Sequence, residues 1–207
     1  MARRAEEAAR LHLELVGAAP DGDGTVLLLA PKEPGFWPAF TRSAEYRDGA
    51  PDPLDRWSKR VIGGLARAWG GEALFPSDGP PYPPFISWAL ASGRAWASPV
   101  GLLVHERMGL WLSLRGAVRL AEPAPPTPRL QSPCAHCEGQ PCRSACPVGA
   151  LGPDAYDTAA CHANLDSLDS AECLSRGCAA RRACPLSQAY GRQDAQSAFH
   201  MRAFHPR

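Results

Sequence analysis

Cysteines are the residues of this chain whose type and spacing could do chemistry. The 207 residues include eight of them, all between positions 134 and 184, and two of them stand directly before a proline. The eight are Cys134, Cys137, Cys142, Cys146, Cys161, Cys173, Cys178 and Cys184. Cysteine thiolates are soft anionic ligands for zinc and for iron–sulfur clusters. Eight thiolates in one short segment therefore predict two four-cysteine metal centres.

The form of the two groups favours 4Fe–4S clusters. In ferredoxins with two clusters, the cysteine that precedes proline binds the cluster of the other group. Here the Cys-Pro steps are Cys146-Pro147 and Cys184-Pro185. One cluster is then expected on Cys134, Cys137, Cys142 and Cys184. The other is expected on Cys146, Cys161, Cys173 and Cys178. The spacing departs from the bacterial ferredoxin run, because four residues rather than two separate Cys137 from Cys142.

Other uses of the cysteines remain open at this point. Two structural zinc sites would need the same eight thiols, and the Cys134-x-x-Cys137 step is compatible with both metals. Disulfides are the third choice. His136 and His162 each stand beside a cysteine, where either could replace a thiolate. Because eight thiols already suffice for two sites, we interpret both histidines as neighbours of the ligands or as surface residues.

Composition and charge exclude several classes of protein. The net charge of +1 gives no overall field that would attract nucleic acid or an anionic membrane. The first residues include Glu6, Glu7 and His12 where a secretory signal would be apolar, and no run has the length of a membrane span. We therefore expect a cytoplasmic protein, where thiols stay reduced and metal ligation is favoured over disulfides.

The distribution of aromatic residues divides the chain. All six tryptophans precede residue 121, and all eight cysteines follow it. Residues 121–133 between them are rich in proline, which favours an extended connector. The sequence thus predicts an α/β domain at 1–120, a connector at 121–133, and an iron–sulfur module at 134–207 that ends in a helix.

The pattern of apolar residues predicts a mixed α/β layer in the first part. Helices are expected at residues 2–16, 54–69 and 85–96, with a turn at 21–24 and a proline-rich loop at 76–84. Strands are expected at residues 25–30, 101–105 and 110–120. In the tail, residues 187–204 predict a helix whose apolar stripe, which includes Tyr190 and Phe204, packs onto the first part.

The order of the cysteines resembles the ferredoxin-like part of epoxyqueuosine reductases and reductive dehalogenases. The match rests on Cys146-Pro-Val-Gly-Ala-Leu151, on Asp157-Thr-Ala-Ala-Cys161 and on Gly177-Cys178. The resemblance implies a ferredoxin-like module with two 4Fe–4S clusters after a nitroreductase-like half that binds a corrinoid. It also implies that Asp78, ahead of Pro80, stands in the place of a catalytic aspartate.

Three functions follow from these observations. The first is an electron-transfer protein with two 4Fe–4S clusters, whose partner is a redox protein. The second is a small corrinoid-dependent reductase or corrinoid-handling factor, with Asp78 as the proton donor and Tyr82 as a weaker choice. The third is a zinc-binding interaction module. His105, between two expected strands, is interpreted as a structural histidine rather than a base.

Overall fold

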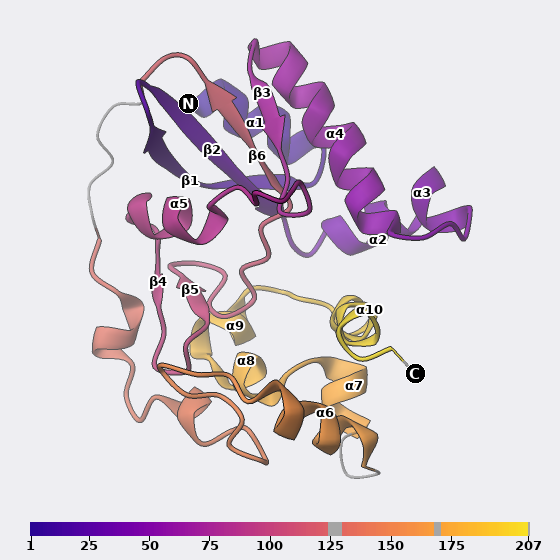
Figure 1. Ribbon diagram of the computed structural model, residues 1–207, viewed down its shortest axis with the longest axis vertical. Helices are drawn as coiled ribbons and strands as arrows, with labels where there is room; N and C mark the ends of the chain where they lie inside the picture. Colours follow the sequence, from indigo (N-terminus) through magenta and orange to yellow (C-terminus); the bar gives the residue numbers. More distant parts are fainter. Residues whose placement is uncertain (124–129, 168–170, 207) are drawn as a thin grey trace. The chain divides into compact units, whose positions relative to one another are not determined.

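The computed structural model describes residues 1–123, 130–167 and 171–206 (Figure 1). It has a mixed α/β fold with two antiparallel sheets. The chain divides into two compact units by its internal contacts. We call Met1–Ala95 with Ser113–Leu130 the sheet unit, and Trp96–Leu112 with Gln131–Arg207 the cysteine unit. Of the expected connector, residues 124–129 lie outside the described residues.

The sheet unit is built on four antiparallel strands in the order β1-β2-β6-β3. The strands are β1 (Leu13–Asp21), β2 (Gly24–Pro31), β3 (Glu72–Leu74) and β6 (Gly116–Leu120). The expected turn at 21–24 joins β1 to β2, and Asp21 pairs with Gly24 across it. Every residue of β2 except Gly24 is buried, because this strand lies inside the sheet. Its continuous apolar run was therefore a correct signal of a buried strand.

The helices of this unit pack against the sheet or against one another. They are α1 (Ala2–Arg10), α2 (Phe36–Thr41), α3 (Ala44–Arg47), α4 (Pro53–Trp69) and α5 (Phe85–Ala91). The long helix α4 packs against β3 and β6, whereas α5 packs against β1 and β2. The apolar residues that predicted a helix at 54–69 are all buried on α4, which confirms that prediction. They are Leu54, Trp57, Val61, Leu65 and Trp69.

The prediction of a helix over residues 2–16 was wrong beyond Arg10, because β1 begins at Leu13. His12 between them has a positive φ of 57°, which ends the helix. In β1 the pairing register shifts between Leu15 and Gly17, as a bulge requires. The buried residues Leu13, Val16 and Ala19 recur every three positions along β1, where an undisturbed strand alternates by two.

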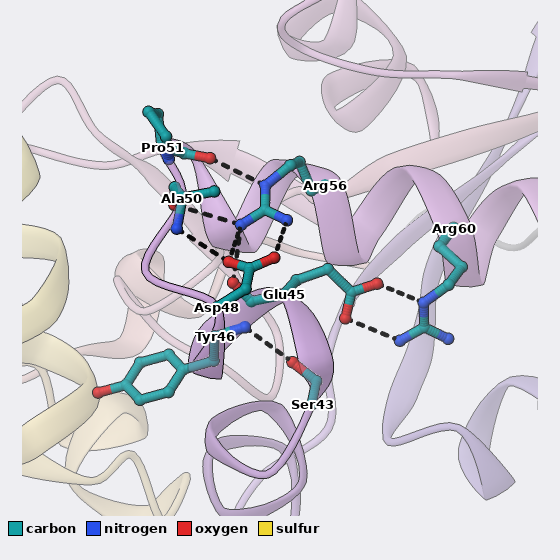
Figure 2. A network of polar contacts seen from close by, with 8 residues as sticks. All are labelled: Ser43, Glu45, Tyr46, Asp48, Ala50, Pro51, Arg56 and Arg60. Carbon is teal, nitrogen blue, oxygen red and sulfur yellow. Dashed lines mark hydrogen bonds and ion pairs between the residues drawn. The ribbon is translucent and has the colours of Figure 1, made fainter.

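Aromatic packing and ion pairs fix the region of α2, α3 and α4. Phe36 stacks on Phe40, with ring centroids 5.8 Å apart, and meets Trp57 edge-on at 5.2 Å. Figure 2 shows the polar network around α3, in which Arg56 binds Asp48 and Arg60 binds Glu45. The sheet unit thus combines a large apolar core with charged groups that pair at its edge.

The cysteine unit is made of short elements. It includes the β5 strand (Leu103–His105), which pairs with β4 (Ala95–Ala97), and two 3₁₀ turns, η1 (Pro133–His136) and η2 (Pro141–Arg143). Its α-helices are α6 (Thr158–Asp166), α7 (Ala171–Arg176), α8 (Ala179–Ala183), α9 (Pro185–Ala189) and α10 (Asp194–Phe204). Among these helices, α10 packs along α7.

Three expected elements differ from the structure in this part of the chain. The helix expected at 85–96 ends at Ala91, since Gly93 takes a positive φ of 67° and β4 follows. The strand expected at 110–120 is limited to Gly116–Leu120, and residues 110–112 belong to the cysteine unit. The helix expected at 187–204 is two helices, α9 and α10, with a break at residues 190–193. Phe204 stacks on His162 inside the cysteine unit, 4.6 Å between ring centroids.

Candidate metal centres

Residues 96–112 form part of the structure that carries the cysteines. The Leu110 amide donates a hydrogen bond of 2.9 Å to Ser187 Oγ, and the Leu110 carbonyl oxygen accepts one from Arg181. Trp111 lies under the guanidinium of Arg192, 5.3 Å from ring centroid to Cζ. These contacts join residues about 70 to 80 positions apart in the sequence. The cysteine unit therefore begins well before the first cysteine, whereas the sequence placed the boundary near residue 121.

Gly109 permits the closest approach between this segment and a cysteine. Its φ is +56°, and a Cβ atom there would lie 2.5 Å from the Ser187 amide nitrogen and 3.0 Å from Cys184 Sγ. Any residue larger than glycine would therefore push the turn at residues 105–109 away from Cys184. This contact could not be predicted from the sequence, because a single glycine before a strand usually marks an ordinary turn.

The first group of thiols lies against an apolar cluster. Cys142 and Cys184 are buried, at 7% and 9% exposed. Cys134 and Cys137 are partly buried. The apolar side chains packed around Cys142 and Cys184 come from both segments of the unit. They are Val100, Val104, Leu110 and Ala180.

Electrostatic coupling shows which thiols lie near one another in this group. Burial raises the pKa of Cys134, a hydrogen bond with Ser132 lowers it, and the thiols of Cys184 and Cys137 raise it further. Burial likewise raises the pKa of Cys142, with smaller contributions from Cys134, Cys184 and Cys137. Cys184 therefore faces the first three cysteines despite its distance in the sequence.

The second group of thiols is spread over three helices. Cys161 is on α6, Cys173 is on α7, and Cys178 precedes α8 as its N-terminal cap residue. Burial raises the pKa of Cys161, and the thiols of Cys178, Cys146 and Cys173 raise it further. The thiols that act on Cys161 are thus the other three of its expected set. The assignment of these four thiols to one cluster stays a prediction.

Hydrogen-bond donors surround the second group. The Ala150 amide donates to Cys146 Sγ over 3.3 Å. A hydrogen bond between Tyr156 and Cys161 lowers the pKa of the Cys161 thiol. Burial lowers the pKa of the Arg181 guanidinium, while Cys178 and Tyr156 favour its charged form. An arginine retains its charge in proteins, and the Arg181 guanidinium donates to the Leu110 carbonyl oxygen.

The thiols fit iron–sulfur clusters in number, type and grouping. No disulfide joins any of the eight cysteines, all of which are described. Among the described residues, no three His, Cys, Asp or Glu side chains meet closely enough to hold a single metal ion. A 4Fe–4S cluster does not need such a meeting point, because each of its four thiolates binds a different iron. Each group supplies the four thiols that one cluster requires.

Histidines next to the cysteines bind other side chains. His162 Nδ1 lies 2.6 Å from His205 Nδ1, and His205 Nε2 lies 2.9 Å from Asp166 Oδ1. His136 Nε2 is 2.9 Å from Gln131 Oε1. These contacts agree with the interpretation of His136 and His162 as neighbours of the ligands.

The remaining residues singled out in the sequence lie in loops or at the end of a strand. Asp78, in the sheet unit, accepts a hydrogen bond of 3.0 Å from the Phe75 amide and pairs with Lys59 Nζ at 3.2 Å. Tyr82 is 66% exposed. His105 is buried, and its Nδ1 accepts from the amides of Arg107 and Met108, which confirms its structural role.

Two functional candidates were missed by sequence reasoning. Arg181 stands in an Arg-Arg pair whose first member binds the Leu110 carbonyl oxygen and whose second, Arg182, pairs with Glu172. Gln196 on α10 is fully buried, and neither polar atom of its side chain has a hydrogen-bond partner among the described residues. No local pattern distinguishes either residue from a surface helix position.

Comparisons with known proteins do not assign this chain to a family. In its described ranges, no helix has the length and apolar character needed to cross a membrane. Searches against known protein families, curated proteins and solved structures find no match to the chain.

Proposed function

We propose that this protein binds two 4Fe–4S clusters and transfers electrons as a ferredoxin-like protein of the cytoplasm. The observation that carries the proposal is the division of eight thiols into two groups of four within one compact unit. The first cluster is assigned to Cys134, Cys137, Cys142 and Cys184. The second is assigned to Cys146, Cys161, Cys173 and Cys178. When bound, such clusters supply one-electron transfer over a wide range of potentials.

The surroundings of the thiols support this assignment. Burial of Cys142 and Cys184 excludes water that would otherwise compete for iron. The amide of Ala150 donates to Cys146 Sγ, and hydrogen bonds to sulfur are among the features by which proteins set cluster potentials. Metal ligation would also supply folding energy to a unit made of short helices and turns.

A corrinoid-dependent activity has less support. The resemblance implies Asp78 as its proton donor, yet both carboxylate oxygens of Asp78 are engaged, one by the Phe75 amide and one by Lys59. A carboxylate held in this way closes a turn. We therefore propose a redox protein as the partner, and a bound corrinoid remains an outcome that titration with cobalamin would reveal.

Anaerobic purification tests the cluster proposal directly. Two 4Fe–4S clusters require about eight irons and eight sulfides per chain and a brown colour. The measurement is iron, sulfide and zinc content together with electron paramagnetic resonance (EPR) after reduction. A colourless protein that holds two zinc ions would rule the proposal out in favour of a structural zinc module.

A pair of matched variants tests the assignment of ligands. Cys184→Ser is expected to abolish the EPR signal of the first cluster, although Cys184 lies 42 positions beyond Cys142. Cys178→Ser, six positions earlier in the chain, is expected to abolish the other signal. If both variants removed the same signal, the crossed assignment would be wrong while the two clusters would stand.

A further inference from the structure

Two exposed aromatic rings stack on each other in the cysteine unit. Tyr156 is 40% exposed, and Phe204 at the end of α10 is 37% exposed. Their ring centroids are 6.2 Å apart, and the ring planes differ by 12°. Phe204 also stacks on the imidazole of His162, which follows Cys161 directly on α6. We call these three rings the aromatic stack. It connects the neighbour of a predicted cluster ligand with solvent.

Backbone and side-chain contacts hold the exposed rings in place. The backbone of Tyr156 pairs with that of Leu151 in an antiparallel bridge, and Leu151 packs against the buried apolar cluster of the unit. Next to Phe204, the imidazole of His205 contacts Asp166 Oδ1 at 2.9 Å. A ring that is already immobilised loses little conformational entropy on binding, as rigid aromatic anchors of protein interfaces do. The aromatic stack therefore has the properties of an interface anchor.

The chain segment that carries Tyr156 and α6 is acidic. Residues 144–175 contain five Asp and Glu residues and no Lys or Arg, although the whole chain has 22 Lys and Arg against 21 Asp and Glu. Asp154 and Asp157 are exposed on either side of Tyr156 in the sequence. The side chain of Asp166, which binds the histidine next to the stacked ring of α10, is 68% exposed. Exposed carboxylates thus border the aromatic stack.

Arginines of the neighbouring helices leave this acidic character in place. Arg176 and Arg182 both pair with Glu172, the last acidic residue of the segment. The guanidinium of Arg181 binds a backbone carbonyl oxygen within the unit. The exposed Arg202 stands two positions before the stacked ring of α10, so the two side chains leave the helix about 200° apart. The surface around the aromatic stack therefore keeps a negative charge.

We propose that the aromatic stack and the carboxylates around it form the docking surface for the redox partner, and that this partner presents a basic surface with an apolar centre. An exposed apolar patch with a polar rim is typical of an interaction site. Small interfaces with complementary charge suit the brief encounters of redox proteins. A second copy that docked by the same surface would bring like charges together, which opposes association.

This inference rests on the proposed function, because it assigns a route out of the second cluster. One electron leaves the reduced cluster and reduces a one-electron acceptor in the partner. The cluster returns to its oxidised state, and no covalent bond forms or breaks. The aromatic stack lies beside Cys161, so a partner docked there approaches the second cluster at a ligand.

Reduction of cytochrome c, a basic haem protein, tests the docking surface. The iron-loaded chain is reduced with dithionite under argon and freed of excess reductant, and stopped-flow absorbance follows the change from ferric to ferrous haem. A neutral benzoquinone, which needs no docking surface, serves as the reference acceptor. The ratio of the two rate constants cancels changes in cluster content. It is expected to fall about tenfold from low to high ionic strength, because salt screens attraction between opposite charges.

Two variants with matched controls locate the surface. Phe204→Ala removes the central ring of the aromatic stack and should lower the ratio about tenfold, as the loss of an interface anchor does. Its control is Ile86→Ala, at an exposed apolar position on α5 of the sheet unit. Asp154→Lys should lower the ratio about tenfold at low ionic strength and less at high ionic strength. Its control is Asp23→Lys, at an exposed position in the turn between β1 and β2.

Three results would overturn the proposal. One is a ratio that does not depend on salt. Another is an equal fall in each variant and its control. The third is a wild-type dimer in sedimentation that Phe204→Ala dissociates, which would assign the surface to a second copy. If Phe204→Ala fails to fold, the salt dependence and Asp154→Lys still decide. Absence of iron would instead refute the proposed function, whereas an iron-loaded chain insensitive to these substitutions would refute the docking surface alone.

Discussion

The two units of this protein are stabilised in different ways. In the sheet unit, large side chains such as Phe36, Phe40 and Ile62 are completely buried. In the cysteine unit, the buried cluster around Val104 and Leu110 contains two of the cysteines themselves. The first unit has an apolar core of its own, whereas the second builds its core around the thiols that we assign to metal.

Removal of iron should produce the largest difference in stability between the two units. Treatment with a chelator under reducing conditions is expected to abolish protection from hydrogen exchange in residues 131–206 and 96–112, because ligation supplies much of their folding energy. Protection in β2 and α4 should persist. Hydrogen exchange measured by mass spectrometry provides this comparison, and equal loss in both units would contradict independent stabilisation.

A core substitution should produce the opposite pattern. Phe36→Ala removes a fully buried ring that contacts Phe40 and Trp57, which costs about 3–5 kcal/mol. The sheet unit should lose protection in urea at a lower concentration, while iron content stays at the wild-type level. Tyr82→Ala, at an exposed position in the same unit, is the control. Loss of iron in Phe36→Ala alone would show that the cysteine unit depends on the sheet unit.

Gly109→Ala should affect one cluster and spare the other. The added methyl group would meet the Ser187 amide nitrogen at 2.5 Å and Cys184 Sγ at 3.0 Å, at a positive φ that disfavours alanine. We expect iron content to fall from about eight to about four per chain, the stoichiometry of one remaining 4Fe–4S cluster. Gly49→Ala shares a positive φ but has no atom within 4 Å of the added carbon, so it controls for backbone strain. A similar loss of iron in both variants would contradict the steric explanation.

The ion pairs of Figure 2 should give the sheet unit a pH dependence in acid. The hydrogen bond from Arg60 lowers the pKa of Glu45 from 4.5 to about 2. A carboxyl group whose pKa is lowered by folding stabilises the folded state above its unfolded pKa, and this contribution is lost as pH falls toward the folded value. The difference in urea midpoint between wild type and Glu45→Gln should therefore shrink between pH 4.5 and about 2. An NMR titration that places the Glu45 pKa near 4.5 would contradict this.

Gln196→Leu should have the smallest effect. The amide of Gln196 is buried without a partner in the described protein, on a helix that packs along α7, where Cys173 lies. If the amide donates to sulfur of the second cluster, leucine should lower the reduction potential of that cluster. The melting temperature should not fall, because a buried polar group without a partner is costly. A lower melting temperature with unchanged potentials would show that Gln196 only stabilises the fold.

Sequence reasoning succeeded where the signal was local. The run at residues 25–30 and the apolar face of residues 54–69 predicted β2 and α4, because burial and periodicity act within one element. The assignment of the thiols to two clusters by the Cys-Pro steps stays a prediction. Long-range contacts were not predictable in this way. The bulge in β1 interrupts its regular alternation, and the side chain of Arg181 binds the carbonyl oxygen of Leu110, which is 71 positions away.

The interleaving of the two units in the chain has a consequence for synthesis on the ribosome. Strand β6 joins β3 to the rest of the sheet, and it is synthesised after residues 96–112. Within residues 96–112, the Leu110 amide donates to Ser187 Oγ. This hydrogen bond can form only after Ser187, 77 positions later, has been synthesised. Contacts this distant in sequence slow folding. A nascent chain whose residues up to about 130 have left the ribosome would therefore hold a completed sheet and a segment without its partner.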